Sequence, residues 1–229
     1  MTPKNRICEL DAARGFCILA MVAVHLVYDL TELYPVFHIA NPSAFLLVKE
    51  QGGIIFFLIS GVSVTLGHRH LRRGLIVLGC AGAVSAVTAL SGALPIRFGV
   101  LHCLGLCMLL WPVFQKLSRK ELFFAAAAFW AMGAIFPDYS VTPPFLYPLG
   151  LAAPDFVSAD YFPLLPYLGY FLLGSCAGRR FYADGQRLFP RFSAQRPFSR
   201  FLCFCGRHSL FIYLIHQPVL ILAIEAALV

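Results

Sequence analysis

The stretch RGFCILAMVAVHLVYDL, from Arg14 to Leu30, predicts a transmembrane helix with polar groups on one face. Arg14 and His25 are 11 residues apart. At about 100° per residue this separation returns almost to the same helix face, and Asp29 lies one further turn along. Ionisable side chains cost about 2.5–3.5 kcal/mol each in the hydrocarbon core and normally face a bundle interior or a wet cavity. We therefore expect the face formed by these three residues to point into the protein and to serve its function.

The composition indicates an all-α, polytopic membrane protein. The chain has 229 residues, of which 59% are hydrophobic and 13% are charged. Its repeated apolar runs of about 20 residues are typical of membrane-spanning helices rather than of the short alternating strands of a barrel. The first run contains His25 and Asp29 and lacks a small-residue cleavage site, so we expect it to be retained rather than removed as a signal peptide. We expect a single domain over residues 1–229.

Seven spans are predicted from the apolar runs. Their ranges are 13–34, 43–67, 74–94, 98–115, 121–137, 161–178 and 208–228. All of the 18 lysines and arginines except Lys49 and Arg97 then fall on the side that holds the N-terminus. Basic residues concentrate in cytoplasmic loops, so this distribution predicts a cytoplasmic N-terminus and a C-terminus on the other side.

The cysteines and the long outer loop give weaker signals. The eight cysteines are scattered, with most of them inside predicted spans, so no disulfide framework is predicted. Cys203 and Cys205 lack partner ligands at zinc spacing and are interpreted as small buried hydrophobic residues. The loop 138–160 is rich in proline and has three aspartates and no base, which suits either a fixed lid or acceptor platform or a plain connection.

Three predicted spans contribute an intramembrane histidine, namely His25, His102 and His216. A carboxylate four residues along the helix, Asp29, could fix the tautomer of His25 and raise its basicity, as in a general base. The same residues suit two other functions. Paired imidazoles can ligate haem, and chains of histidine and aspartate can relay protons in a coupled transporter.

Arginines on the N-terminal side are candidate phosphate ligands. Arg14 lies at the cytoplasmic end of the polar face, and the loop 179–207 holds seven arginines, including Arg179 and Arg180. The planar guanidinium matches phosphate oxygens, as in a nucleotide-bearing co-substrate. A basic cytoplasmic loop is also expected from topology alone and attracts anionic lipid.

Five stretches together resemble the successive signatures of the small bacterial branch of the heparan-alpha-glucosaminide N-acetyltransferase catalytic-domain family. They run in order from Arg6 to about Leu220: RICELDAARGFCILAMVAVHLVYDL, GGIIFFLISGVSVTLG, RFGVLHCLG, DYFPLLPYLGYFLLG and GRHSLFIYLIHQPVL. The resemblance implies a transmembrane acyltransferase in the bacterial inner membrane. It would move an acetyl group from cytoplasmic acetyl-CoA to an extracytoplasmic glycan or amino sugar.

The resemblance also implies roles for individual residues. Arg14 would lie near the phosphates of the coenzyme, and His25 would be the catalytic base or an acyl relay. The lysosomal enzyme of the family has asparagine at the position of His25 and an essential histidine in the following luminal loop, which here corresponds to His38. His102 and Ser60 are candidate donors to the oxyanion of the transition state.

The expected partners are therefore acetyl-CoA as co-substrate, a sugar acceptor and membrane lipid. We expect no metal ion and no nucleic acid. Seven helices form a small shell for a cavity that holds two substrates, and a homodimer is one arrangement that would enlarge it.

Overall fold

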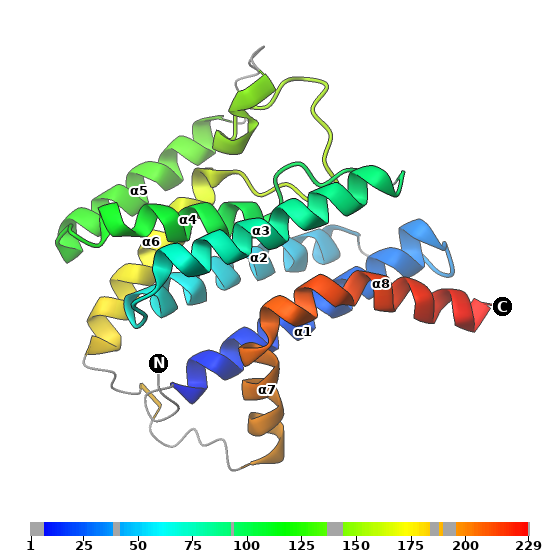
Figure 1. Ribbon diagram of the computed structural model, residues 1–229, viewed down its shortest axis with the longest axis horizontal. Coiled ribbons are helices and arrows are strands. Elements are labelled where there is room, and N and C mark those ends of the chain that lie inside the picture. Colours follow the sequence, from blue (N-terminus) through cyan, green and yellow to red (C-terminus); the bar gives the residue numbers. More distant parts are fainter. Residues whose placement is uncertain are drawn as a thin grey trace. The chain divides into compact units, whose positions relative to one another are not determined.

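The computed structural model describes residues 7–38, 42–92, 94–136, 144–183, 188–189 and 196–228. These residues are almost entirely helical (Figure 1), and the β pairing among them is one isolated bridge between Phe98 and Tyr161. The elements are α1 (Cys8–Tyr28), η2 (Asp29–Leu33), α2 (Pro42–Thr65), α3 (His70–Leu90), α4 (Val100–Phe114), α5 (Arg119–Ile135), η4 (Pro144–Leu149), α6 (Leu164–Phe181), α7 (Pro197–Arg207) and α8 (Ser209–Leu228).

The chain divides into two compact units. The first unit comprises residues 1–56 and 187–229, and therefore contains α1, α7 and α8. The second unit comprises residues 57–186, and contains α3 to α6. Helix α2 belongs to both, because its last turns fall in the second unit. Each unit is described by itself below.

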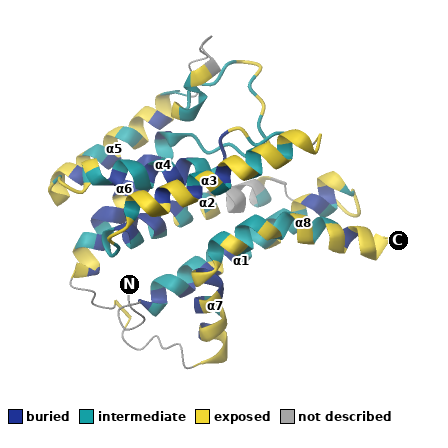
Figure 2. Ribbon diagram, viewed as in Figure 1, coloured by how far each residue is buried: buried dark blue, intermediate teal, exposed yellow. Residues whose placement is uncertain are grey.

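All seven predicted spans are helices, with ends that differ from the predicted ones by a few residues. Within the part of the chain that the structure describes, three stretches are long and apolar enough to cross a membrane: Cys8–Leu33, His70–Leu90 and Ser209–Leu228. Large apolar side chains on these and other helices are exposed (Figure 2), among them Val87, Leu90, Phe124 and Leu222. Large apolar side chains left exposed on long apolar helices belong in lipid. The chain is therefore an integral membrane protein, while the number of seven spans and the orientation of the termini remain predictions.

Helices α1 and α8 run in the same direction within the first unit (Figure 1). His25 lies beside His216, and farther along both helices the Tyr34 hydroxyl donates to Glu225 Oε1 over 3.0 Å. If both helices span the membrane, the chain between them crosses it an odd number of times. Five crossings by α2 to α6 would meet this requirement, as the predicted topology does.

Helix α7 was not predicted, because its range was assigned to the cytoplasmic loop 179–207. It packs against the beginning of α1 in a backbone contact made by two glycines. A Cβ on Gly15 would collide with the Leu202 carbonyl oxygen, and a Cβ on Gly206 would collide with the Asp11 carbonyl oxygen. Paired glycines allow two helix backbones to approach this closely.

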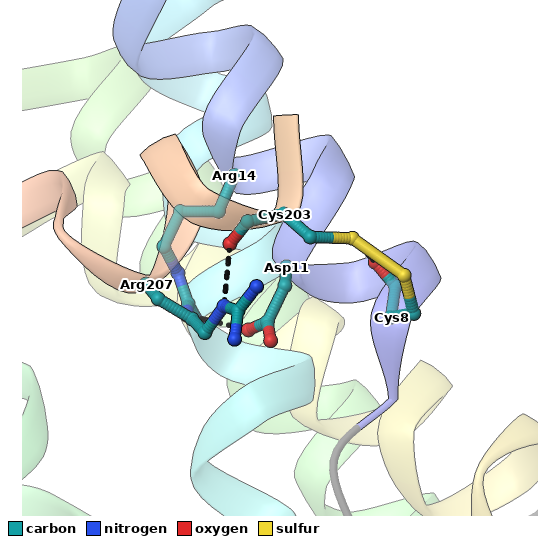
Figure 3. Close-up of a disulfide and its surroundings, with 5 residues drawn as sticks. All are labelled: Cys8, Asp11, Arg14, Cys203 and Arg207. Atoms are coloured by element: carbon teal, nitrogen blue, oxygen red, sulfur yellow. Dashed lines mark hydrogen bonds and ion pairs between the residues drawn. A yellow bond between two sulfur atoms is a disulfide. The ribbon is translucent and has the colours of Figure 1, made fainter. Parts of the chain in front are cut away.

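A disulfide between Cys8 and Cys203 also joins α1 to α7 (Figure 3). The two Cα atoms are 6.1 Å apart, within the usual range for a disulfide. The interpretation of Cys203 as an unpaired buried hydrophobic residue was therefore wrong. Its partner is 195 residues away in the sequence, so spacing gave no indication of the pair. Cys205 is buried and unpaired, in agreement with the prediction for it.

The segment before α7 is held against α1 by the carboxylate of Glu9. The two oxygens of Glu9 accept hydrogen bonds from the backbone N–H groups of Leu188 and Phe189, at 2.8 and 3.0 Å.

Four basic residues of the predicted cytoplasmic surface lie outside the described residues: Lys4, Arg6, Arg187 and Arg191.

The second unit has its own close-packed crossing. The Ser175 hydroxyl on α6 donates to the Gly61 carbonyl of α2, and a Cβ on Gly61 would collide with the Phe171 carbonyl. Helix α5 begins with a reciprocal capping box between Ser118 and Glu121, which satisfies two backbone donors of its first turn.

The described part of the outer loop packs as a small aromatic cluster rather than as a bare connection. Tyr147 stacks on Phe156 at 4.9 Å, and Phe156 contacts the Tyr161 ring at the same distance. The Tyr161 hydroxyl donates to the Tyr147 carbonyl. Whether the loop serves as a lid or acceptor platform remains a prediction.

The glycine crossing of α1 and α7 gives a first testable prediction. Gly206→Ala places a methyl group against backbone that cannot move aside, so we expect a loss of about 1–3 kcal/mol of stability. This corresponds to a melting temperature in detergent lower by about 2–4 °C per kcal/mol. Gly79→Ala is the matched control, because a Cβ there meets nothing within 4 Å. The control should be neutral or stabilising by about 0.5–1 kcal/mol. Equal melting temperatures for the two variants would contradict the crossing.

Candidate functional site

Two imidazoles meet where α1 and α8 lie side by side. The ring centroids of His25 and His216 are 4.9 Å apart, and the ring planes are inclined by 75°, so one ring presents its edge to the other. Both residues lie inside stretches that are long and apolar enough to span a membrane. The sequence placed these two histidines in separate predicted spans, and the structure brings their rings into contact.

Each ring is held in one tautomer by its own helix. His25 Nδ1 lies 2.9 Å from the Met21 carbonyl oxygen, and His216 Nδ1 lies 2.6 Å from the Tyr213 carbonyl oxygen. Because a carbonyl oxygen only accepts hydrogen bonds, each Nδ1 carries the proton, and the Nε2 of each neutral ring keeps its lone pair. Nε2 of His216 is buried and has no hydrogen-bond partner among the described residues. The pair therefore presents nitrogen lone pairs, and the described structure leaves that of His216 without a partner.

Asp29 and Gln217 form a second contact between the same helices. The Asp29 side chain is only 1% exposed, and both of its carboxylate oxygens lie 2.9 Å from Gln217 Nε2. A buried carboxylate requires hydrogen-bond donors in place of water. The other end of the Gln217 amide, Oε1, is buried with no partner among the described residues. This end can accept a hydrogen bond from a substrate.

At this level α1 passes into irregular helix geometry, and α8 contains a proline. Asp29 opens a π-helical turn, η2, in which the Tyr34 N–H donates to the Asp29 carbonyl over 2.8 Å. In α8, Pro218 follows Gln217 directly and lies inside the helix. Single π turns inside α-helices occur frequently at functional sites. Irregular backbone next to four polar side chains supports a site at this position.

The described structure does not contain the predicted hydrogen bond between His25 and Asp29. Among the described interactions, His25 bonds to the backbone of its own helix, and Asp29 bonds to Gln217. The tautomer of His25 is thus fixed by Met21 rather than by a carboxylate. The ring contact between His25 and His216 also leaves no space for a porphyrin plane between them, so the geometry does not fit the haem interpretation.

Gln217 was not identified from the sequence as a candidate site residue. Its signal was present, because an amide inside an apolar stretch of 20 residues needs a partner within the protein. The sequence alone did not show that this partner is Asp29, 188 residues away.

Arg14 lies on α1 about 16 Å before His25, at a rise of about 1.5 Å per residue. Its guanidinium pairs with Asp11 at 3.8 Å. Arg207 reaches the same corner, where its Nε donates to the Cys203 carbonyl over 3.0 Å (Figure 3). Arg207 follows Gly206, which packs against the Asp11 carbonyl, so both arginines lie near the beginning of α1. His38, the fourth predicted residue in this unit, follows η2 and is exposed.

The remaining predicted residues belong to the second unit. His102 Nδ1 accepts a hydrogen bond from the Gly99 N–H at 3.2 Å, and its Nε2 faces the Ser85 hydroxyl at 3.3 Å. Because a backbone N–H can only donate, the neutral ring carries its proton on Nε2 and donates it to Ser85. The Ser85 hydroxyl in turn donates to the Ile96 carbonyl. Both nitrogens of His102 are therefore engaged, so a catalytic role for this histidine remains a prediction without further support.

The two arginines predicted to bind the co-substrate make local contacts. Arg179 donates to the carbonyl oxygens of Leu117 and Gln115, and its guanidinium lies 5.3 Å from the Trp111 ring centroid. It thereby satisfies carbonyls at the end of α4. Arg180 is exposed and lies over the Phe181 ring. Among the described residues, no group of three or more histidine, cysteine, aspartate or glutamate side chains is placed to hold a metal ion.

Comparison with known families assigns the chain. The family model described as "Heparan-alpha-glucosaminide N-acetyltransferase, catalytic" matches residues 6–218. No curated protein and no solved structure matches the sequence. The family match covers nearly the whole chain, including every residue of the sites described above.

The contact between Asp29 and Gln217 can be tested by a double-mutant cycle. Gln217→Met leaves a buried carboxylate without its donor, and Asp29→Leu leaves the amide without its acceptor, so each change should cost at least about 1–3 kcal/mol. The double variant should cost less than the sum, with a coupling of about 0.5–3 kcal/mol. Melting temperatures in detergent report these costs, and Gln51→Met, at an exposed position of α2, is the control. Strictly additive costs would show that the two side chains do not interact.

Proposed function

This chain belongs to the heparan-alpha-glucosaminide N-acetyltransferase catalytic-domain family, and we propose that it transfers an acetyl group from acetyl-CoA to a hydroxyl or amine of a sugar across the membrane. The observation that carries the proposal is the His25 and His216 pair, with both Nδ1 atoms held by backbone carbonyls and the Nε2 lone pairs left as bases. Acetyl transfer needs a base of this kind at the reacting atoms.

The proposed reaction breaks the thioester C–S bond and forms a C–O or C–N bond to the acceptor. The proton lost by the acceptor passes to an imidazole Nε2 and from there to the departing thiolate, which leaves as free coenzyme A thiol. The thioester is already reactive, so the protein mainly aligns the reactants, removes one proton and stabilises the oxyanion. Attack by a histidine Nε2 on the thioester, through an acyl-histidine, uses the same atoms in two steps.

Arg14 is the proposed ligand for the phosphates of acetyl-CoA. It lies on the same helix as His25 and about 16 Å from it, a distance that an extended pantetheine arm can cover. Arg207 adds a second guanidinium at this corner. Arg179 and Arg180, the other predicted ligands, belong to the second unit, where the Arg179 guanidinium donates to two carbonyl oxygens. In this proposal the donor binds on the side where α1 begins, which the charge distribution predicts to be the cytoplasm.

Asp29 and Gln217 are proposed to position the acceptor. The Gln217 Oε1 atom can accept from a sugar hydroxyl or amine, while its Nε2 remains on the carboxylate. His38 is exposed beyond η2 and is the alternative base that the family resemblance implies.

Proton-coupled transport is the second candidate function, and the buried carboxylate favours it. Asp29 has no cationic partner among the described residues, and carboxylates with histidines inside a membrane form proton relays. In liposomes this function predicts substrate flux driven by a pH difference with no consumption of thioester. Flux that is absent while acetyl-CoA is consumed would remove it.

The proposal is tested by release of free thiol from acetyl-CoA, with purified protein, glucosamine and a panel of glycan acceptors. His25→Gln and His216→Gln should each lower turnover by about 10²–10⁴-fold, the usual contribution of general acid–base catalysis. His68→Gln, at an exposed position outside the site, is the matched control and should retain turnover. Loss of turnover in His38→Gln alone would move the chemistry to the outer loop. Absence of both thiol release and acetyl-CoA binding in the wild type would refute the proposal.

The role of Arg14 predicts a separate kinetic change. Arg14→Gln should raise the KM for acetyl-CoA by about tenfold or more with little change in kcat, because a phosphate contact is made equally in the ground state and the transition state. Arg72→Gln, at an exposed position of α3, is the charge-matched control. A lower kcat with an unchanged KM would place Arg14 outside the co-substrate site.

A further inference from the structure

Helix α7 is too short and too basic to cross a membrane. Its 11 residues extend over about 16 Å, roughly half of a hydrocarbon core. The segment from Arg196 to Arg207 holds three arginines and no acidic residue. A helix of this kind is stable only on a protein surface, in water or at the membrane interface.

Its side chains form three facets. The first is buried and includes Ser199, Cys203 and Gly206. The second is apolar and exposed: Phe198, Phe201 and Phe204 are three residues apart, share one face, and are 71%, 52% and 54% exposed. The third is basic and exposed, and consists of Arg200 and Arg207, with Arg196 at the N-cap.

The first facet fixes α7 to the end of a predicted span. Gly206 and Leu202 meet Asp11 and Gly15 in backbone contacts, and Cys203 is bonded to Cys8. All of these partners lie in the first two turns of α1. Figure 1 shows α7 running crosswise to both α1 and α8. A helix that crosses the end of a span at a steep angle lies along the surface of the membrane that this span enters.

We propose that α7 is an interfacial helix that binds the anionic phospholipid surface on the side where α1 begins. The phenylalanine facet enters the boundary between headgroups and acyl chains, and Arg196 and Arg200 contact lipid phosphates. Both facets have the chemistry that such a surface requires, because interfacial helices combine aromatic residues on one side with basic residues on the other. A soluble phosphate would match the arginines but would leave three phenylalanines exposed to water.

The test places a fluorophore on the apolar facet of the full chain in vesicles. Phe201→Trp is reconstituted in phosphatidylcholine with phosphatidylglycerol, and only one lipid carries bromine atoms near the headgroup end of its acyl chains. Wild-type protein, with its native Trp111 and Trp130, gives the background to subtract. We expect strong quenching of the added tryptophan, greater by about twofold or more when phosphatidylglycerol carries the bromine at the same mole fraction.

Charge removal tests the role of the arginines. The combined change Arg196→Gln and Arg200→Gln, in the Phe201→Trp protein, should abolish the preference for phosphatidylglycerol. Arg72→Gln with Arg73→Gln removes the same charge from α3 and should leave the preference intact. Quenching by aqueous iodide rather than by brominated lipid would show that α7 stands away from the membrane or is covered by protein. Quenching without headgroup preference, or its loss in the α3 control, would refute recognition of anionic lipid by α7.

Discussion

A buried carboxylate in an apolar helix must find its donors within the protein, and this constraint organises the first unit. Asp29 meets it through Gln217, so one amide ties the end of α1 to the middle of α8. The same contact sets the register between the two helices. In that register His25 and His216 come into ring contact, although neither ring bonds to the other or to the carboxylate. The histidine pair therefore depends on an interaction that belongs to neither histidine.

The crossing of α1 and α7 sets where α8 can begin. Because α7 occupies the first turns of α1, α8 starts beside the middle of α1 and its eighth residue reaches the level of His25. Gly15 and Gly206 make the crossing close enough for the Cys8 to Cys203 disulfide, and they bring Arg14 and Arg207 to the same end of α1. A contact made by two residues without side chains thus positions both the proposed phosphate corner and, one helix later, the proposed base.

The helices were predictable because apolar runs of about 20 residues leave few alternatives, and each of the seven predicted ranges contains a helix. The histidine and aspartate of α1 stood out for the same reason, since polar groups are rare in such runs. What the sequence did not show depends on distant partners. In the sequence, the range of α7 has the composition of a basic loop, and only its contact with α1 through Gly206 shows why it is a helix. Cys203 likewise has the pattern of a small hydrophobic residue, and only the structure shows that Cys8 lies beside it. His102 resembles His25 in sequence, but a backbone N–H on one ring nitrogen and a hydroxyl on the other distinguish it.

The tautomers bear directly on how the proposed transfer would move its proton. With each Nδ1 held by a carbonyl, neither ring can lose that proton to its neighbour, so proton traffic is confined to the two Nε2 atoms. Of these, His216 Nε2 is buried without a partner among the described residues, and a lone pair of this kind binds the first suitable donor that enters. A sugar hydroxyl or amine is such a donor, and its proton is the one that acetyl transfer must remove. In the proposed transfer the second ring, in contact with the first, would stabilise the resulting charge through its own lone pair or pass the proton on to the thiolate. Two fixed imidazoles can in this way serve as base and acid in succession without exchange with bulk water.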